Sequence, residues 1–408
     1  MRKLSVTICI SVLILLLSSC QSTGETAENI SAEPETAVSA EETATALETT
    51  APVIVIENET DPPETETVPE AQAEEEDIPP EEGMVRSFLT GSWITKEQAA
   101  KRPVAVMYPT DKKAQPQYGL SNVSVFYEIL EEGSMSRQMG ILEDYTGLSR
   151  IGNIRSIRDY FIYEALEWDP ILVHFGGPEV FVKDLLTRED VDNLNGVSGV
   201  MGDDYGAFYR VPRNVTTTHN AFTDSEHLEK AIEKAGFSVT HRDEYWSGEK
   251  EAHWKFAKKE KPVDLSGYAE AQNAAELSMA GMFPIDQPTF SYNAEDGKYY
   301  RCIYGEPQKD ALTGEQMAFD NILIESSVYG ERGAGYLYFH VLDAGHFGWY
   351  ITRGKMIPVR WQKTADYECT RFYDPAGKEI TLNEGKTMIC IGREGNDSFT
   401  ADGVKYDL

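Results

Sequence analysis

The sequence is poor in basic residues, and one long stretch near its N-terminus has no basic and no aromatic residues at all. Of 408 residues, 37 are Lys or Arg and 68 are Asp or Glu, which gives a net charge of −31. Because contacts with phosphate groups need a basic face, this balance excludes a general role in nucleic-acid binding. Direct adhesion to anionic lipid head groups is disfavoured for the same reason.

The missing residue types are concentrated in residues 21–85. This stretch holds 19 Asp and Glu but no Lys, Arg, Phe, Trp or Tyr. Residues 1–20 carry +2 and residues 21–85 carry −19, so residues 86–408 retain −14 of the net −31. A segment of this composition cannot bury a hydrophobic core, so we expect residues 20–85 to form a disordered acidic tether. Repulsion between its like charges should extend this tether.

The N-terminus has the organisation of a targeting segment. The apolar run at residues 8–17 is shorter than the roughly 20 residues of a membrane-spanning helix, and it follows Arg2-Lys3. Leu17-Ser18-Ser19-Cys20 resembles the lipobox of bacterial lipoproteins. This resemblance implies that residues 1–19 are a signal peptide and that Cys20 is lipidated, which anchors the chain in the cell membrane on its extracytoplasmic side. The alternative is an ordinary signal peptide followed by an unrelated cysteine.

Residues 86–265 are expected to form an α/β domain, because strand patterns alternate with helix patterns there. Residues 103–109 and 171–175 read as buried strands. Residues 180–186 and 225–235 read as helices, and a glycine follows the second of them.

The remainder of the chain has a different pattern. Residues 266–287 contain Gly, Ala and Ser and are predicted to connect two domains. Residues 288–408 are predicted to form a mainly β domain made of short strands. Its clearest element is a hairpin over residues 289–301 with an Asp296-Gly297 turn.

A candidate site is predicted within residues 147–178, which read as loop, helix, turn, strand and glycine loop. Ser156 and Asp159 are spaced like a capping box, so the helix is expected to start there. Arg155 and Arg158 lie at this start, where free N–H groups already favour an anion. Gly176-Gly177 follows the strand and allows a sharp turn or a close approach to a ligand.

Arginine forks and imidazoles could converge here on a carboxylate or a phosphate group. The candidate ligand-binding residues are Arg137, Arg155, Arg158, His174, Gly176, Gly177, His219 and Asn220. In the alternative, structural interpretation, the arginines pair with Glu128, Glu132, Asp144 or Asp159, and His174 is a satisfied strand histidine. We favour a ligand site for the cluster, since several basic groups close together in an acidic protein need a partner. The partner would be an anionic small molecule or a cell-envelope protein.

Catalytic patterns are weaker. Ser156 and His174 could act as nucleophile and base, and Glu128 with Asp159 could form a carboxylate pair. Carboxylates are too abundant for the second pattern to be specific, and capping explains Ser156. A binding or assembly role is therefore favoured, and the alternative is a cell-envelope hydrolase or transferase acting on a glycan or a phosphate ester.

The sequence gives no indication of a metal or a cofactor. No His and Cys spacing matches a zinc signature, and no glycine-rich phosphate loop of the nucleotide type is present. Cys302, Cys369 and Cys390 are the cysteines of the expected folded part, and they allow at most one disulfide whose pairing the sequence leaves open.

An ordered series of short motifs over residues 86–405 resembles the YerB-like lipoproteins of Gram-positive bacteria. The motifs of the first half are at residues 102–107, 116–121, 151–158, 174–177 and 219–220, and those of the second half are at residues 292–293, 348–350, 371–374 and 377–380. The chain departs from the family pattern after Met107. The resemblance implies a lipoprotein location and two adjacent domains, and it brings no established activity.

Overall fold

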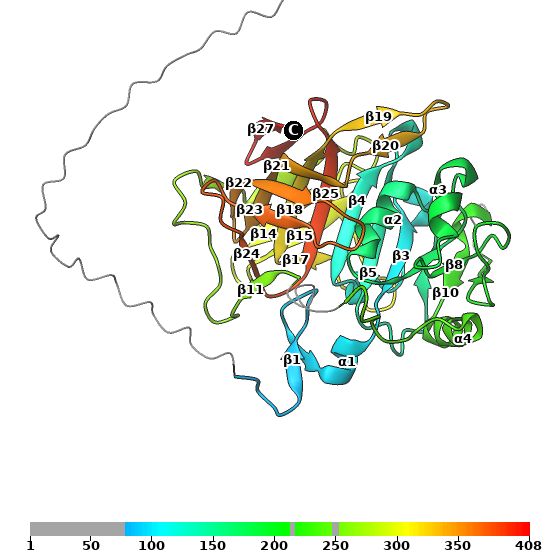
Figure 1. Ribbon diagram of the computed structural model, residues 1–408. Helices are drawn as coiled ribbons and strands as arrows, with labels where there is room; N and C mark the ends of the chain where they lie inside the picture. The colour runs from blue at the N-terminus through cyan, green and yellow to red at the C-terminus, as the bar shows by residue number, and fades with distance from the viewer. Residues whose placement is uncertain (1–77, 213–216, 247–252) are drawn as a thin grey trace, which may run out of the picture. The chain divides into compact units, whose positions relative to one another are not determined.

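The apolar stretches of the sequence become the central strands of one large sheet (Figure 1). The computed structural model describes residues 78–212, 217–246 and 253–408. Five neighbouring strands are buried at all or nearly all of their positions: β3 (Val104–Pro109), β4 (Val125–Leu130), β5 (Ser136–Leu142), β18 (Asn321–Ser327) and β25 (Thr387–Arg393). Burial along a whole strand means that both faces of the sheet are covered.

This sheet has eleven strands drawn from both halves of the chain. Its order is β12 (Gln272–Asn273), β22 (Lys355–Lys363), β21 (Asp343–Thr352), β18, β25, β4, β5, β3, β7 (Ile171–His174) and β8 (Asn193–Asn195), with β23 (Arg371–Tyr373) beside β22. The two halves meet where β25 pairs in parallel with β4, so that Cys390 lies opposite Glu128. Glu75–Leu408 accordingly forms one compact unit.

A second sheet of seven strands lies within the C-terminal half. Its order is β16 (Glu306–Pro307), β15 (Lys298–Ile303), β14 (Thr289–Asn293), β13 (Glu276–Ser278), β26 (Ser398–Ala401) and β27 (Val404–Asp407), with β17 (Ala318–Phe319) beside β15. The predicted hairpin over residues 289–301 is confirmed as β14 and β15. Residues 266–287, expected only to connect, supply β12 to the large sheet and β13 to the second one.

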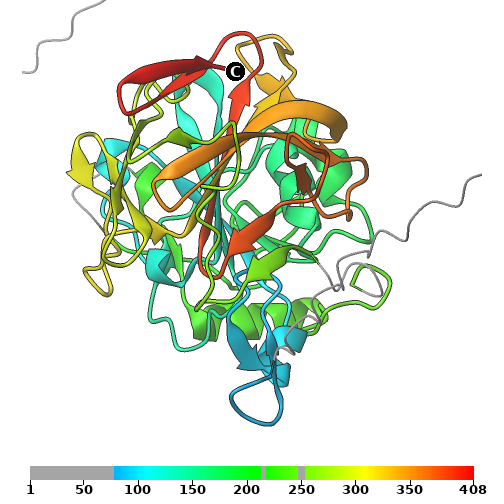
Figure 2. The same cartoon turned by 90° about the vertical axis from the view of Figure 1, so that its left-hand side faces the viewer.

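Four small sheets complete the strands. They pair β1 (Met84–Arg86) with β2 (Trp93–Thr95), β6 (Ile151–Gly152) and β9 (Tyr209–Arg210) with β10 (Ala221–Thr223), β11 (Lys255–Ala257) with β24 (Thr381–Asn383), and β19 (Tyr329–Glu331) with β20 (Leu337–Phe339). The C-terminus lies at the opposite end of the unit from β1 (Figures 1 and 2).

Helices are few, and in the described residues all α-helices fall between residues 96 and 235. They are α1 (Lys96–Ala100), α2 (Asp159–Leu166), α3 (Glu179–Leu186) and α4 (Ser225–Ala235), joined by the 3₁₀ turns η1 (Lys112–Ala114), η2 (Leu120–Asn122), η3 (Glu132–Ser134) and η4 (Thr217–His219). In Figure 1, α2 and α3 lie on the side of the unit that holds β3 and β8, and α4 lies near β10. The described part of the chain is therefore mainly β, and its α-helices all precede residue 236.

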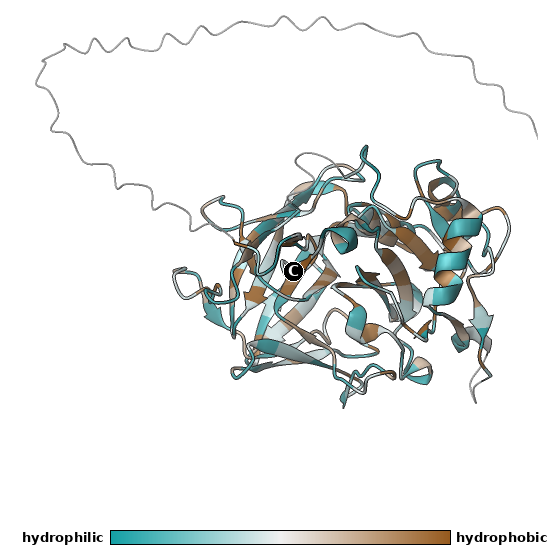
Figure 3. Ribbon diagram, turned by 90° about the horizontal axis from the view of Figure 1, so that it is seen from below, coloured by the Kyte–Doolittle hydropathy of each residue, from teal (hydrophilic) through white to brown (hydrophobic). Residues whose placement is uncertain are grey.

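Hydrophobic residues gather in the inner strands, whereas loops and outer helix turns are hydrophilic (Figure 3). None of the helices in the described part of the chain has the length and apolar composition needed to cross a bilayer. The predicted signal peptide, Cys20 and almost all of the acidic tether lie outside the described residues. Cys302, Cys369 and Cys390 are free thiols.

Candidate functional site

The candidate site lies at one edge of the large sheet, where several strands begin or end together. β3, β7 and β8 run parallel, so their carboxyl ends share this edge. β5 runs antiparallel to β3 and places Arg137 opposite Pro109, the last residue of β3. The edge outside the carboxyl ends of parallel strands is where α/β sheets commonly bind ligands.

Residues 153–158 cross these strand ends and are held by backbone hydrogen bonds. The Arg155 N–H donates to Met107 O at 2.9 Å, and Arg155 O accepts from the Phe175 N–H at 2.9 Å. Gly177 allows the close approach, because a Cβ there would lie 3.0 Å from Ile157 O and 3.0 Å from Val182 Cγ2. The segment that carries Arg155 and Arg158 is thus fixed by β3 on one side and by the loop after β7 on the other.

The predicted capping box is wrong. Helix α2 starts at Asp159 with Arg158 as its N-cap, and no side chain caps it. The Ser156 hydroxyl instead donates to Phe175 O at 3.1 Å, a bond that joins two loops. Asp159 pairs with Arg332 at 2.5 Å.

Arg137 and Arg158 both bind Glu131, and Arg158 also binds Glu132. Glu131 and Glu132 directly follow β4, and Arg137 Nε donates to Glu131 Oε2 at 3.1 Å. Arg158 Nε donates to Glu132 Oε1 at 2.8 Å, and Arg158 Nη2 lies 2.9 Å from Glu131 Oε2. The structural interpretation therefore holds for Arg158 with Glu132, and Glu131 is a partner that the sequence did not single out. Its position directly after a buried strand was the available signal.

Arg155 is different, because no carboxylate of the described residues forms an ion pair with it. Its side chain is half-buried, and its Nε is buried without a hydrogen-bond partner. Burial and the nearby Arg137 guanidinium lower the pKa of Arg155, while Asp111 and Glu131 act in the opposite direction. Arg137 also keeps a buried Nη1 without a partner. The site thus holds unsatisfied cationic donors, which are costly to bury.

His219 and Asn220 lie at different distances from this cluster. His219 Nε2 is 3.9 Å from an Asp111 carboxylate oxygen, and Asp111 in turn acts on Arg155. Asn220 Oδ1 accepts from Arg210 Nη1 at 2.7 Å, which ties it to β9. His219 therefore borders the cluster, while the Asn220 side-chain oxygen serves Arg210.

His174 has protein partners at both of its ring nitrogens. It is fully buried, with Nδ1 2.9 Å from Gly176 O and Nε2 3.3 Å from Asn193 Oδ1. Burial lowers the pKa of His174 and favours its neutral form. Gly176 adopts φ +75° and its N–H donates to Asn195 Oδ1 at 2.9 Å, so this glycine shapes the loop and offers no free N–H.

The arrangement does not support the two catalytic patterns. Ser156 and His174 use their polar atoms on other partners, so no nucleophile–base pair forms between them. Glu128 binds Arg301 at 2.6 Å inside the protein, whereas Asp159 binds Arg332. These two carboxylates therefore belong to separate ion pairs.

One set of described side chains has the spacing of metal ligands, with ligand atoms within 4.8 Å of one another: Glu167, His253 and Cys369. The Lys363 ammonium lies 3.5 Å from Glu167 and would repel a cation. The Cys369 thiol donates to His253 O at 2.8 Å, and burial together with Glu167 raises its pKa. These residues form a buried polar network around one carboxylate.

Comparisons with known proteins match the two halves of the chain to two family models. Residues 89–238 match the family described as "Protein of unknown function (DUF3048) N-terminal domain", and residues 281–389 match its C-terminal domain. The "Putative lipoprotein YerB" of Bacillus subtilis (strain 168) is 26% identical over 325 residues, which cover 77% of this chain and 88% of the relative. The crystal structure of the YerB protein from Bacillus subtilis superposes with a TM-score of 0.62 at 23% identity, over 75% of this chain and 96% of that one.

Proposed function

Because the chain belongs to the YerB-like two-domain family, we propose that it is a lipid-anchored extracytoplasmic lipoprotein whose folded part binds an anionic group. The anionic group is a carboxylate or phosphate on a small molecule or on a cell-envelope protein. Arg155 is the principal residue that binds this anionic group. Arg137 and Arg158 lie beside Arg155, and His219 borders the cluster.

The anchor rests on Cys20 and the four-residue lipobox that ends with it. Two acyl chains on one residue anchor firmly, since each buried methylene contributes roughly 0.8 kcal/mol. Cys20→Ala should move the protein from the membrane fraction to the soluble fraction, or leave it unprocessed. A Cys20→Ala chain that loses its signal peptide and still sediments with membranes would contradict this anchor.

The observation that carries the binding proposal is the unpaired, half-buried Arg155 guanidinium beside two other arginines. Arg137 and Arg158 use Glu131 and Glu132, and nothing in the described residues neutralises Arg155 in the same way. An incoming oxyanion would supply the missing acceptors. Charge-assisted bonds to arginine are about twice as strong as neutral ones.

Binding is favoured over hydrolysis or group transfer because a catalyst needs a base within about 2.6–3.2 Å of a nucleophile. The hydroxyl between Arg155 and Arg158, that of Ser156, is bonded to a backbone carbonyl. A binding site needs only convergent donors, and the unpaired guanidinium of Arg155 and the unpartnered Nη1 of Arg137 are available as such donors.

Thermal melts of the folded part test the proposal with sodium sulfate and sodium phosphate as probes, and with sodium chloride at matched ionic strength. Wild type should gain stability with the oxyanions, by about 2.7 kcal/mol at a hundred times the Kd. Arg155→Gln should abolish this gain. Without anion it should melt at the same temperature as wild type or above it, because a cation held near two others is removed. Arg360→Gln, which changes an exposed arginine on β22, should keep the full gain.

The opposite pattern would contradict the proposal. It would consist of a large loss of unliganded stability in Arg155→Gln together with no oxyanion effect in wild type. Arg155 would then be part of the structural electrostatics of the strand ends.

A further inference from the structure

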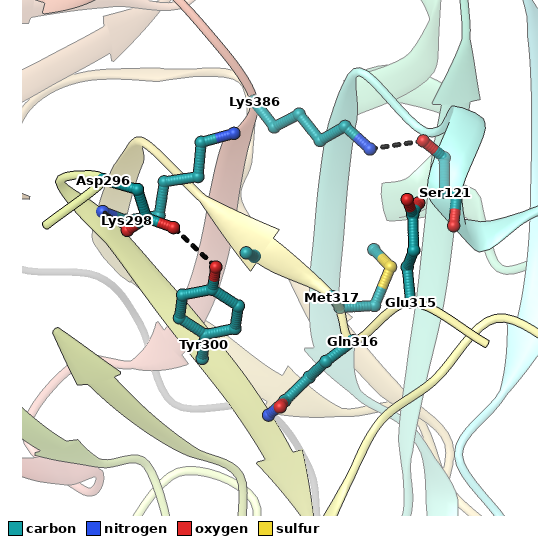
Figure 4. A pocket seen from close by; sticks show the side chains of 9 residues that line it. Ser121, Asp296, Lys298, Tyr300, Glu315, Gln316, Met317 and Lys386 are labelled. Carbon is teal, nitrogen blue, oxygen red and sulfur yellow. Dashed lines mark hydrogen bonds between the residues drawn. The ribbon is translucent and has the colours of Figure 1, made fainter. Parts of the chain in front are cut away.

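The described residues hold a pocket of about 330 Å³ between the β14–β15 hairpin and the start of β25, and its charges are mixed (Figure 4). The Lys386 ammonium donates to Ser121 O, and the Glu315 carboxylate lies at the same end of the pocket. No side of this pocket therefore selects a charged ligand. Several buried polar atoms without a hydrogen-bond partner lie instead around Arg155.

Asp111 lies in a loop after β3 that runs past the segment of Arg155. Two hydrogen bonds bracket this loop. The Arg155 N–H donates to Met107 O at 2.9 Å, and Asn153 Nδ2 donates to Ala114 O at 2.7 Å. Burial and a neighbouring guanidinium lower the pKa of Arg155, and among the carboxylates Asp111 opposes this lowering most strongly. The Asp111 carboxylate is therefore a close neighbour of Arg155.

These two charges interact at a distance but do not pair with each other. No ion pair joins Asp111 and Arg155. The Asp111 side chain is 34% exposed and accepts no hydrogen bond in the described part of the chain. His219 Nε2 lies 3.9 Å from Asp111 Oδ1, which is too far for a hydrogen bond. A charged acceptor thus lies beside a cationic donor, and each can still take a partner.

Two amide side chains add further acceptors to the same stretch. Gln117 and Asn153 are fully buried, and their N–H groups donate to Pro109 O and to Ala114 O. Their side-chain oxygens have no hydrogen-bond partner. A buried acceptor without a donor costs free energy, so a donor that reaches it is favoured. The stretch around Asp111 therefore holds acceptors that need donors.

We propose that the anion bound at Arg155 is a phosphate ester with a hydroxyl group next to the phosphate, as in a polyol phosphate or a sugar phosphate. This inference rests on the proposed anion site. The phosphate has three free oxygens, enough to accept from Arg155 and from the unpartnered Nη1 of Arg137 together. The hydroxyl donates to the Asp111 carboxylate.

Asp111 gives the site its selectivity. A phosphate without a neighbouring donor meets the Asp111 carboxylate and is repelled by it. A hydroxyl suits this position better than an ammonium group, because an ammonium would lie close to the guanidinium groups of Arg137, Arg155 and Arg158.

Calorimetric titration of the full chain with glycerol phosphate and propyl phosphate tests this proposal. The two esters carry the same charge on a chain of the same length and differ in their hydroxyl groups. Glycerol phosphate should bind about tenfold more tightly than propyl phosphate or better, as expected for one hydrogen bond to a charged acceptor.

Variants locate the preference. Asp111→Ala should fold, since this carboxylate accepts no hydrogen bond in the described residues, and it should bind the two esters with equal affinity. It should bind inorganic phosphate at least as tightly as wild type, because a repelling carboxylate is removed. Asp184→Ala, which changes an exposed aspartate on α3, should keep the wild-type preference. Arg155→Gln should lose binding of both esters and of inorganic phosphate.

The outcomes separate this inference from the anion site on which it rests. If wild type bound neither ester nor inorganic phosphate, the anion site itself would be wrong. If both esters bound equally well and Arg155→Gln bound neither, the anion site would stand and the hydroxyl contact would be wrong. A preference that survives in Asp111→Ala would also overturn the proposal. So would tighter binding of aminoethyl phosphate than of glycerol phosphate, because the donor would then be an ammonium group.

Discussion

At the scale of single residues, the carboxylate of Glu167 joins parts of the chain that are far apart in sequence. Glu167 Oε1 accepts from the Tyr127 hydroxyl at 2.6 Å, and Oε2 accepts from the Thr370 N–H at 2.6 Å and from its hydroxyl at 2.9 Å. The ammonium of Lys363 lies 3.5 Å away, and both side chains are fully buried. Burial alone would raise the pKa of Glu167, but Lys363 and the surrounding donors hold it below its ordinary value.

Glu164, one helical turn earlier, has the opposite behaviour. It is also buried, and its Oε2 has no hydrogen-bond partner. Burial, Glu325 and Glu167 all raise the pKa of Glu164 well above its ordinary value. The environment therefore shifts the pKa values of these two neighbouring glutamates in opposite directions.

Their amide variants should differ in stability. At pH 7, Glu167→Gln leaves the buried Lys363 without its anion and should lose about 3–5 kcal/mol of unfolding free energy. Glu164→Gln replaces a group that the fold prefers neutral and should be equal to wild type or more stable. Urea unfolding at pH 4 and pH 7 measures both.

The pH dependence follows from the signs of the two shifts. The contribution of Glu167 is present above the unfolded pKa of about 4.3 and is lost as the pH falls, so the deficit of Glu167→Gln should shrink toward pH 4. The contribution of Glu164 is present below that pKa and is lost as the pH rises, so the advantage of Glu164→Gln should grow toward pH 7. Equal losses in the two variants at both pH values would contradict the assignment.

At the scale of elements, the sequence predicts well where local signals determine the structure. Helix α4 starts and ends as expected, because Asp224 caps it and Gly236 follows it at φ +75°. The strand expected over residues 103–109 is confirmed as β3, since a run of apolar residues between prolines suits a buried strand. These elements need no knowledge of distant contacts.

The sequence predictions fail where contacts between residues far apart in the sequence determine the local structure. Ser156 has the spacing of a helix cap, yet the carbonyl of Phe175, 19 residues away, takes its hydroxyl. In the candidate site, the sequence predicted the arginines but could not tell that Arg158 is paired while Arg155 is not. That difference depends on the positions of Glu131 and Glu132 after β4, which only the sheet register fixes.

At the scale of the whole molecule, the two halves of the chain contribute neighbouring strands to the middle of one sheet. β25, from the C-terminal half, lies between β18 and β4 and is hydrogen-bonded to both. A buried ion pair crosses the same boundary, from Arg301 to Glu128 at 2.6 Å. The Ser136 hydroxyl, from β5, contacts both Glu128 and Asp286.

This connection makes separate folding of the halves unfavourable. A chain that ends at residue 280 would lose β25 and Arg301, which would leave β4 with an unpaired edge and Glu128 without its cation. An exposed apolar edge strand promotes aggregation, and an uncompensated buried charge costs about 3–5 kcal/mol. Such a cost is a large part of the roughly 5–15 kcal/mol that stabilises an ordinary domain.

We therefore expect residues 78–408 to unfold in one transition, and residues 78–280 alone to lack a cooperative one. Thermal unfolding of both chains, followed by circular dichroism and by calorimetry, measures this, because coincident transitions by the two probes indicate a single cooperative unit. The variant Leu323→Ala on β18 tests whether a change in one half destabilises the whole unit. It removes a fully buried side chain from the C-terminal half, and it should lower the transition of the whole unit by about 2–5 kcal/mol. If it lowered only one of two resolved transitions, or if the fragment melted cooperatively, the halves would be independent domains that merely touch at β4 and β25.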